Sequence, residues 1–334
     1  MGTACYRKHL SWVHNINCPA HFSISYDCSR DNHITETPLC MKFYCIIVTF
    51  NPDIKLFTKV LNSISINTKY IDIVDNGSSN IEEIRNINTD FNLTCLTENL
   101  GIAAAQNIGI KAAFSHDADY IWLSDQDTIY SSKFILNMCN CITELKQKKI
   151  NYSVIGPCYI DSLKNKLIPF IRYTPFAQEI IPNRGINFVS QLISSGMIIP
   201  VSVFAHVGYK REDLFIDWVD FEWCWRSEQL GYKVVVYEGE TIRHALGDKV
   251  VSFLGKKITL RSPDRRYFFI RNSIYLSLHS NAIPIQARIE IFIKTFIWMF
   301  IFPMASENNK LDYFRASLLG FFHGLTARLG PKSE

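Results

Sequence analysis

The stretch KFYCIIVTF at residues 42–50 decides the fold class of this chain of 334 residues. Its apolar residues follow one another without alternation, as they do in a strand buried on both faces of a parallel sheet. Residues 53–67 then show helical spacing. The expected apolar face of that helix holds Ile54, Phe57, Leu61 and Ile64. A buried strand followed directly by an amphipathic helix indicates an α/β domain.

The same alternation continues to residue 123. Strands are predicted at 70–74, 93–97 and 120–123, and helices at 82–87 and 101–114. This order predicts an α/β fold with a mostly parallel sheet flanked by helices. In such folds the ligand binds at the carboxyl ends of the strands.

The second half of the chain is less regular. Strands are predicted at 154–157, at 189–200 around a turn at 194–196, and at 233–237, and a helix is predicted at 214–230. Residues 261–328 are aromatic, basic and mostly helical in pattern. We therefore expect a helical C-terminal extension.

Three segments are expected along the chain. Residues 1–40 show neither helix nor strand periodicity, which predicts either that Met41 is the natural start or that 1–40 is a poorly ordered leader. Residues 41–255 form the expected catalytic domain, and residues 256–334 form the extension.

The composition favours some classes of protein and disfavours others. Hydrophobic residues make up 48% and charged residues 20%, which is enough for a sizeable core. A net charge of +4 with no concentrated basic face argues against nucleic-acid binding, but it suits an anionic membrane or a phosphorylated substrate. The ten cysteines have no CxxC spacing, and we expect them to be reduced thiols of a cytoplasmic protein.

Two carboxylates, Asp125 and Asp127, follow the predicted strand at 120–123. Carboxylates that flank one residue at a strand end can converge on Mg²⁺ or Mn²⁺, which often share such ligands with phosphates. The ion then neutralises the charge of a diphosphate leaving group. An Asp-x-Asp pair is common by chance, so its position after a strand is what favours a metal site.

The earlier predicted strands also end in polar residues. Thr49 closes the first strand, Asp75 and Asn76 close the second, and Asn99 and Gly101 follow the third. An aspartate can accept a hydrogen bond from a base or a ribose hydroxyl, and a glycine lets the backbone approach a ligand. Each group alone is also ordinary turn chemistry. Together they predict one binding edge.

Four strings carry a resemblance to a known family. They are CIIVTFNP (45–52), IDIVDNGSS (71–79), LTENLGIAAAQNIGI (96–110) and YIWLSDQDT (120–128). They look like the nucleotide-sugar-binding half of the family 2 glycosyltransferases, which have the Rossmann-like GT-A fold. Within that family the chain is most similar to bacterial rhamnosyltransferases of O-antigen and surface-polysaccharide assembly. The similarity covers residues 41–276.

The resemblance implies roles for the matching residues. The donor nucleoside would be bound by Asp75, Thr49 and Asn76. The diphosphate and the sugar would be held by Asn99, Gly101, Asn107 and Asp125. The metal would be bound by Asp125, Asp127 and His244, the last in the string RHALGD at 243–248. A neutral imidazole can supply such a ligand.

The acidic string DWVDFE at 217–222 offers candidates for a general base. An inverting transferase needs a base that takes the proton of the acceptor hydroxyl. The family has an acidic pair here, and its first position is Val219 in this chain, so Asp220 is the first choice, with Glu222 and Asp217 as alternatives. Acids at a helix start are also favoured by the macrodipole alone. The aromatic residues that could stack on sugars are Trp218, Phe221, Trp223 and Trp225.

The resemblance also implies an acceptor side. It would be lined by Ser194, Ser195, Gly196 and Met197. A diphosphate of the donor or the acceptor could contact Arg265, Arg266 and Arg271, although these positions could equally form a solvated face.

The C-terminal segment has a membrane-like composition. Basic residues exceed acidic ones between Lys256 and Lys294, and an aromatic run follows at 292–302. The longest apolar run, at 295–304, has about half of the ~20 residues that a spanning helix needs. This pattern is typical of an interfacial anchor, and a helix buried on the catalytic domain is the alternative.

We therefore expect a cytoplasmic enzyme, peripheral on the inner face of the cytoplasmic membrane. It would transfer L-rhamnose with inversion from dTDP-L-rhamnose to a polyprenyl-diphosphate-linked O-antigen unit, using Mg²⁺ or Mn²⁺. A UDP-sugar donor carrying galactose, galactofuranose or N-acetylhexosamine is the nearer alternative. A sugar nucleotidyltransferase is disfavoured, because residues 51–53 are Asn-Pro-Asp where such enzymes carry a Gly-rich basic loop. A non-enzymatic sugar-binding module would not need both the metal motif and the later acids.

Overall fold

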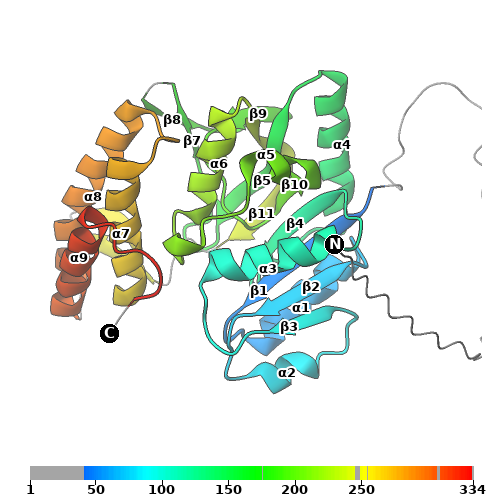
Figure 1. Ribbon diagram of the computed structural model, residues 1–334, viewed down its shortest axis with the longest axis horizontal. Helices are drawn as coiled ribbons and strands as arrows, with labels where there is room; N and C mark the ends of the chain where they lie inside the picture. The colour runs from blue at the N-terminus through cyan, green and yellow to red at the C-terminus, as the bar shows by residue number, and fades with distance from the viewer. Residues whose placement is uncertain (1–40, 175, 245–248, 254, 307–308, 333–334) are drawn as a thin grey trace, which may run out of the picture. The chain divides into compact units, whose positions relative to one another are not determined.

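The computed structural model describes residues 41–332 except 175, 245–248, 254 and 307–308, so the expected leader lies outside the described residues. A central sheet has the strand order β3-β2-β1-β4-β10-β5-β11-β9, with β6 paired to β5 (Figure 1). Its strands are β1 Phe43–Thr49, β2 Ile71–Asp75, β3 Asn92–Cys95, β4 Tyr120–Asp125, β5 Tyr152–Asp161, β6 Lys166–Leu167, β9 Ile186–Val189, β10 Met197–Pro200 and β11 Lys233–His244.

Helices cover the sheet and follow it. They are α1 Ile54–Ser65, α2 Ile81–Arg85, α3 Ile102–Phe114, α4 Phe134–Gln147, α5 Phe204–Val207, α6 Val219–Gln229, α7 Pro263–His279, α8 Ile285–Ala305 and α9 Lys310–Leu325. Two small antiparallel sheets are formed by β7 Phe170–Tyr173 with β8 Ala177–Ile180, and by β12 Lys249–Phe253 with β13 Lys256–Leu260.

The predicted mostly parallel architecture is confirmed. β1 is parallel to β2 and β4, β2 to β3, and β5 to β11, whereas β10 is antiparallel to its neighbours. Thr49 pairs in register with Asp75, and Val48 with Asp125. The carboxyl ends of three strands therefore meet at one edge, as the sequence predicts.

Local sequence explains the first βα unit. All seven residues of β1 are buried, which accounts for its unbroken apolar character. Asp53 caps α1 by accepting from the backbone N–H of Leu56. On α3, a Cβ at Gly109 would lie 2.4 Å from Ile46 Cγ2, so only glycine lets this helix approach β1 closely.

The cysteines pack as small apolar side chains. Among the described residues six cysteines are free, and five of them are buried. Burial raises the pKa of Cys139 to about 11 and that of Cys141 to about 12. Buried thiols of this kind are unreactive.

The predicted helix at 214–230 is wrong in its first part. Helix α6 begins at Val219, and Phe215, Asp217 and Trp218 before it have φ values of 64°, 63° and 65°. These left-handed residues form a tight turn fixed by contacts from other elements, which local spacing does not reveal. The turn predicted at 194–196 between strands is longer than expected, because β9 ends at Val189 and β10 begins at Met197, and the loop at 190–196 carries Ser194 to the site.

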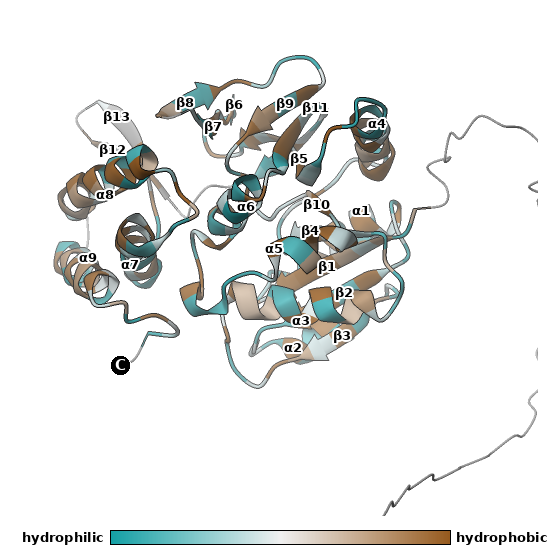
Figure 2. Ribbon diagram, turned by 45° about the horizontal axis from the view of Figure 1, so that its top comes forward, coloured by the Kyte–Doolittle hydropathy of each residue, from teal (hydrophilic) through white to brown (hydrophobic). Residues whose placement is uncertain are grey.

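The extension is helical, as expected. Helices α7, α8 and α9 pack against one another, and Figure 2 shows the hydrophobic colouring of α8 and α9. The boundary expected at residue 256 falls within the β12–β13 hairpin. In the part of the chain that the structure describes, no helix has both the length and the apolar character required to cross a bilayer.

Candidate active site

A cleft of ≈ 480 Å³ opens at the carboxyl edge of the sheet. Its walls come from the strand ends, from the segment before α6 and from the extension. The predicted residues that line it are Asn76, Asn99, Gly101, Asp125, Asp127, Ser194, Asp217, Trp218, Asp220, Phe221, His244 and Arg265. The fold thus gathers most of the predicted site from segments far apart in the sequence.

Three side chains in the cleft form a candidate metal site. One ligand atom from each of Asp125, Asp127 and His244 lies within 4.8 Å of the others. His244 Nδ1 is 3.9 Å from Asp125 Oδ2. This nitrogen is buried and makes no hydrogen bond to any described residue. The two carboxylates suit Mn²⁺ or Mg²⁺, and the imidazole nitrogen can serve as a further ligand to a transition metal such as Mn²⁺.

Asp125 is electrostatically unusual. Burial raises its pKa above the ordinary value, the neighbouring carboxylates of Asp127 and Asp220 raise it further, and His244 opposes the shift. Clustered carboxylates that are partly withdrawn from water repel one another, and a bound cation would relieve that repulsion.

Ser194 connects the metal candidates to the acidic segment. Its hydroxyl donates to Asp125 Oδ1 at 3.1 Å, and its backbone N–H donates to Asp220 Oδ2 at 3.0 Å. The other oxygen of Asp220 forms an ion pair with Lys210. Asp220 is therefore held on both oxygens at the cleft wall.

Lys210 was not predicted as a site residue. Its side chain is fully buried beneath Asp220. Asn107 Nδ2 donates to the carbonyl of Lys210 at 2.8 Å, and Asn107 Oδ1 accepts from its N–H at 3.0 Å. The structure thus places Asn107 behind the cleft, where it orients Lys210, and not among the lining residues. No spacing in the sequence signals this contact across about a hundred positions.

Gln126, the middle residue of the Asp-x-Asp motif, was also missed. Its Oε1 accepts from the backbone N–H of Phe50 at 2.8 Å, and its Nε2 donates to the carbonyl of Phe50 at 3.3 Å. The motif is therefore tied to the end of β1. Phe50 is 45% exposed and lines the cleft.

The predicted residues at the ends of the second and third strands differ in whether they are exposed to the cleft. Asp75 is buried and accepts from Thr49 Oγ1 and from the backbone N–H of Ser78, both at 2.9 Å, so it fixes the turn and lies outside the lining. Asn76 Nδ2 donates to Asn99 Oδ1 at 2.9 Å. That amide pair faces the cleft.

Gly101 joins this edge to the acidic segment. Its φ is 88°, and a Cβ there would lie 2.6 Å from the carbonyl oxygen of Phe215. The same oxygen accepts from the N–H of Ile102 at 2.8 Å. Glycine is required here both for its conformation and for this close approach.

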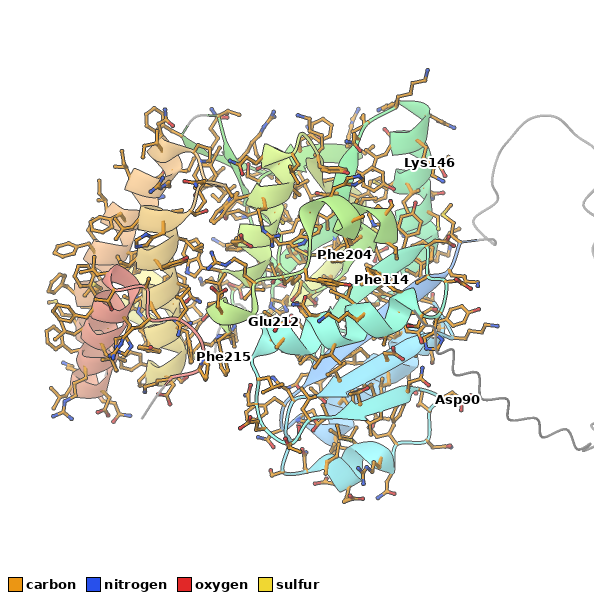
Figure 3. The ribbon with its side chains drawn as sticks, viewed as in Figure 1. Asp90, Phe114, Lys146, Phe204, Glu212 and Phe215 are labelled. Carbon is orange, nitrogen blue, oxygen red and sulfur yellow. The ribbon has the colours of Figure 1, made fainter. Side chains whose placement is uncertain are left out.

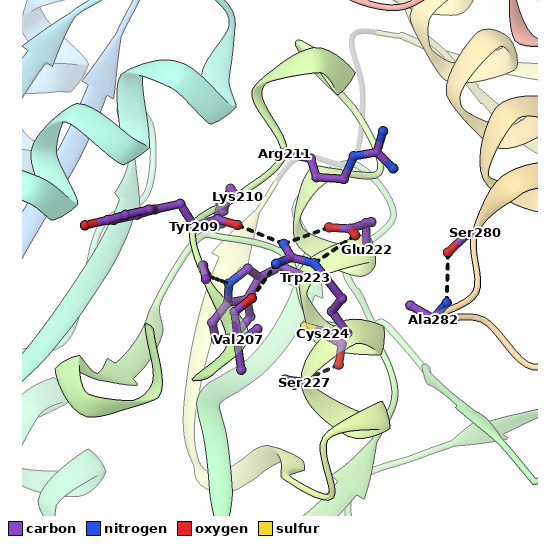
Figure 4. A network of polar contacts seen from close by, with 12 residues as sticks. Val207, Tyr209, Lys210, Arg211, Glu222, Trp223, Cys224, Ser227, Ser280 and Ala282 are labelled. Atoms are coloured by element: carbon purple, nitrogen blue, oxygen red, sulfur yellow. Dashed lines mark hydrogen bonds and ion pairs between the residues drawn. The ribbon is translucent and has the colours of Figure 1, made fainter. Parts of the chain in front are cut away.

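The other two candidate bases are in different places. Asp217 lines the cleft and is paired with Arg261 and with Arg265 Nη2, the latter at 3.5 Å. Glu222 is buried away from the cleft in a bidentate pair with Arg226, with distances of 2.9 and 3.0 Å (Figure 4). Arg226 also donates to the carbonyls of Val207 and Tyr209, so this cluster secures α6.

The four aromatic residues that could stack on sugars are likewise split between the cleft and the core. Trp218 and Phe221 line the cleft, and their rings meet edge to face with centroids 5.8 Å apart. Trp223 and Trp225 are 0% and 1% exposed and belong to the core. Phe269 of α7 adds a third ring to the wall, 5.3 Å from Trp218.

The three predicted arginines also lie in different environments. Arg265 lines the cleft, together with Arg261, which was not predicted. Arg266 is packed over Phe302, 3.6 Å from the ring centroid, and burial lowers its pKa to about 9. Arg271 is fully buried and donates to backbone carbonyls.

Of the expected acceptor loop, only Ser194 faces the cleft. Ser195 is buried and donates to Thr128 Oγ1 at 2.7 Å. A Cβ at Gly196 would lie 2.9 Å from Pro157 Cγ, and Met197 is buried in β10. These neighbours hold the loop in place.

Comparison with known proteins agrees with this geometry. Residues 44–196 match the family model described as Glycosyl transferase family 2. Over 296 residues the chain is 32% identical to a Shigella flexneri protein named dTDP-rhamnosyl transferase RfbF, covering 86% of this chain and 96% of that protein. Among solved structures, GalNAc-T7 with UDP, GalNAc and Mn²⁺ has a TM-score of 0.53 at 12% identity. That match covers 86% of this chain and 56% of the other, so the chain spans just over half its length, and it supports the expected GT-A fold alone.

Proposed function

The chain belongs to glycosyl transferase family 2, and we propose that the sugar it transfers is L-rhamnose, carried by dTDP. The observation that carries this proposal is the 32% identity to a dTDP-rhamnosyl transferase over 96% of that protein's length. The cleft supports it, because the matching strand ends lie side by side around one acidic site. That the chain is a glycosyltransferase does not depend on which sugar it transfers.

Asp125, Asp127 and His244 would hold the divalent ion. They fit it because their ligand atoms converge and because the buried Nδ1 of His244 has no other described partner. When bound, Mg²⁺ or Mn²⁺ would stabilise the negative charge that develops on the departing diphosphate. Ser194 keeps Asp125 oriented toward the same space.

The donor would lie along the edge that holds Asn76, Asn99 and Gly101. The amide groups of the two asparagines and the open backbone at Gly101 suit a ribose and a diphosphate. Thr49 and Asp75 would contribute indirectly, because their hydrogen bonds fix the turn at residues 75–78.

Asp220 is the proposed general base. Of the three candidate acids, Glu222 is buried with Arg226, and the side chain of Asp217 is only 6% exposed, with two guanidinium groups at Oδ1. Asp220 lines the cleft with a 22% exposed side chain. The acceptor hydroxyl would attack the anomeric carbon with inversion, its proton would pass to Asp220, and dTDP would leave.

We also propose an acceptor linked to a lipid diphosphate, as in O-antigen assembly, and a peripheral contact with the inner face of the cytoplasmic membrane. The extension supports both ideas. Arg261 and Arg265 bring two cations to the cleft wall, where an acceptor phosphate could bind.

Helices α8 and α9 each expose an apolar stripe with helical spacing. On α8 it consists of Ile285, Ile289, Ile293, Phe296, Phe300 and Met304. On α9 it consists of Leu311, Phe314, Leu318, Phe322 and Leu325. Lys310 and Arg315 are exposed beside the second stripe. Apolar stripes flanked by basic residues suit an anionic bilayer surface.

The test is a donor screen with purified protein, Mn²⁺ or Mg²⁺, and a synthetic lipid-diphosphate-linked acceptor. We expect dTDP-L-rhamnose to be consumed and the product to have the inverted anomeric configuration by NMR. Turnover of UDP-galactose, UDP-galactofuranose or a UDP-N-acetylhexosamine in its place would contradict the rhamnose proposal while leaving the glycosyltransferase assignment intact.

A further inference from the structure

The segment before α6 has a strained backbone. Phe215, Asp217 and Trp218 all have positive φ values. A left-handed conformation costs a residue other than glycine about 1–2 kcal/mol. Three such residues within four positions persist only where the surroundings fix them. Since Asp217 and Trp218 line the cleft, whatever fixes this segment also fixes a wall of the site.

A fully buried amide of α7 fixes it. Asn272 Nδ2 donates to the carbonyl oxygens of Leu214 and Ile216, both at 2.8 Å. It also donates to the carbonyl oxygen of Asp217, at 3.1 Å. Asn272 Oδ1 accepts from Arg271 Nε at 2.9 Å, so the amide is oriented with its donors toward the segment. Arg271 adds a bond of its own to the carbonyl of Leu214, at 3.0 Å.

Other groups hold the segment from both sides. On the α3 side, the carbonyl of Phe215 accepts a hydrogen bond from the N–H of Ile102. On the α7 side, the ring of Phe215 stacks on Phe268, with centroids 4.8 Å apart. Trp218 Nε1 donates to the carbonyl of Phe269 at 3.1 Å. Figure 3 shows Glu212 and Phe215 between these two helices. The segment therefore spans from the donor edge to the extension.

We propose that Asn272 is a positioning residue, which holds residues 214–218 in the strained conformation that places Asp217 and Trp218 at the cleft. The inference rests on the proposed glycosyl transfer for its catalytic consequence. The extension is then part of the active site, and its contact with the cleft is separate from any contact of α8 and α9 with a membrane. Loss of the amide donors should misplace the part of the cleft wall formed by Asp217 and Trp218 and leave the ligand set around Asp125 in place.

The decisive variant is Asn272→Asp. A carboxylate keeps the volume and keeps Arg271 as a partner, but it offers no N–H to the three carbonyls. We expect kcat to fall by at least about tenfold, since small misplacements near a reacting centre are costly. The KM for the nucleotide-sugar and the Kd of dTDP with Mn²⁺ should each change by less than about threefold. Amide hydrogen exchange in residues 214–218 should become faster.

The matched control is Ser277→Ala on the same helix. Ser277 is buried, and its hydroxyl donates only within α7, to the carbonyl of Ile274. This variant should keep the wild-type kcat and the wild-type exchange in residues 214–218. A folded Asn272→Asp enzyme with wild-type kcat and unchanged exchange would overturn the proposal.

The wild-type protein provides a second test if Asn272→Asp does not fold. The N–H groups of Leu214, Phe215 and Ile216 donate to the carbonyls of Arg211, Glu212 and Leu214, so they should exchange far more slowly than in an open loop. Exchange at open-loop rates would contradict the inference. If the wild type does not use dTDP-L-rhamnose, the rhamnose proposal fails, whereas the exchange measurements still decide the role of Asn272.

Discussion

Lys210 is fully buried and forms an ion pair with Asp220, which lines the cleft. An ammonium group without access to water requires such a partner, because burying an isolated charge is costly. The ion pair fixes one carboxylate oxygen of Asp220, the proposed base, and the backbone N–H of Ser194 donates to the other oxygen. Two residues ten positions apart are thus joined through the fold and not along one helix face.

Lys210→Met should destabilise the protein and lower its activity. Removing one partner of a charge-assisted contact costs about 1.5–3 kcal/mol, and the partial exposure of Asp220 keeps the loss at the lower end. Urea denaturation measures the change in the free energy of unfolding, and turnover is measured in parallel. Lys148→Met, which breaks an exposed pair with Glu144, is the control and should cost less than about 0.5 kcal/mol. Equal effects of the two substitutions would refute a special role for Lys210.

Gly101→Ala should be more harmful than Gly231→Ala. Both glycines have positive φ values, 88° and 86°, but a Cβ at Gly231 meets nothing within 4 Å, whereas one at Gly101 meets Phe215. Gly231→Ala should therefore cost only the conformational strain, about 1 kcal/mol. Gly101→Ala should add displacement of the cleft wall and lower kcat by at least about tenfold. Similar kcat values for both variants would show that the contact with Phe215 is unimportant.

His244→Ala should weaken metal binding. Loss of one of three protein ligands is expected to lower the affinity for Mn²⁺ by at least about tenfold. Isothermal titration calorimetry with MnCl₂ measures it directly. His206→Ala provides the control, because His206 is exposed and bonds to Tyr232. Unchanged Mn²⁺ affinity in His244→Ala would remove this residue from the proposed ligand set.

The stability of the protein should depend on the protonation of Asp72. Burial raises the pKa of this carboxyl, although Asn92 and Tyr44 donate to it and oppose the shift. The folded state therefore binds the proton more tightly than the unfolded state does. Stability is lost as pH rises from the unfolded pKa through the higher folded pKa, and it stays low above that window.

Asp72→Asn should accordingly reduce this loss. The variant should gain in stability relative to wild type as the pH rises above the ordinary aspartate pKa of about 4, as measured by urea denaturation at a series of pH values. Asp90→Asn, at an exposed position, should leave the pH dependence unchanged. A wild-type pH dependence in Asp72→Asn would mean that this carboxyl is not responsible.

The apolar stripe on α8 should mediate binding to vesicles. Replacing Phe296 and Phe300, which are 46% and 47% exposed, with serine removes aromatic surface without touching the cleft. Co-sedimentation with vesicles that contain anionic phospholipid should fall severalfold. Leu136→Ser on α4, at a side chain that is 49% exposed, should pellet like wild type. Equal pelleting of the wild type, the Phe296/Phe300 variant and the Leu136 variant would contradict the membrane proposal.

Periodicity and strand-end chemistry were sufficient to predict the sheet edge. The buried run of β1 and the polar residues after β2 and β4 are local patterns, and parallel pairing brings them together. The pairing of Lys210 with Asp220, the left-handed turn at 215–218 and the amide of Asn272 were not predicted. Each depends on contacts between segments that are far apart in the sequence. At the turn before α6, tertiary hydrogen bonds override the local propensity for helix.

Burial likewise separates residues that look equivalent in the sequence. Asp220 and Glu222 lie two positions apart on α6 and therefore point in different directions, one to the cleft and one to Arg226. Helical direction explains the difference between these two acids after the start of α6 is known, and the sequence did not locate that start. Trp218 and Trp225 also differ, because Trp218 precedes α6 and lines the cleft, whereas Trp225 is buried within the helix.

The most direct test of metal-dependent rhamnosyl transfer is the release of dTDP from dTDP-L-rhamnose by the wild-type enzyme with a lipid-diphosphate-linked acceptor. The assay compares Mn²⁺ with EDTA, and wild type with Asp125→Asn. We expect release with Mn²⁺ that is lost in EDTA and reduced at least about a hundredfold in Asp125→Asn. Release that persists in EDTA, or an Asp125→Asn enzyme as fast as wild type, would contradict the metal site at the centre of this account.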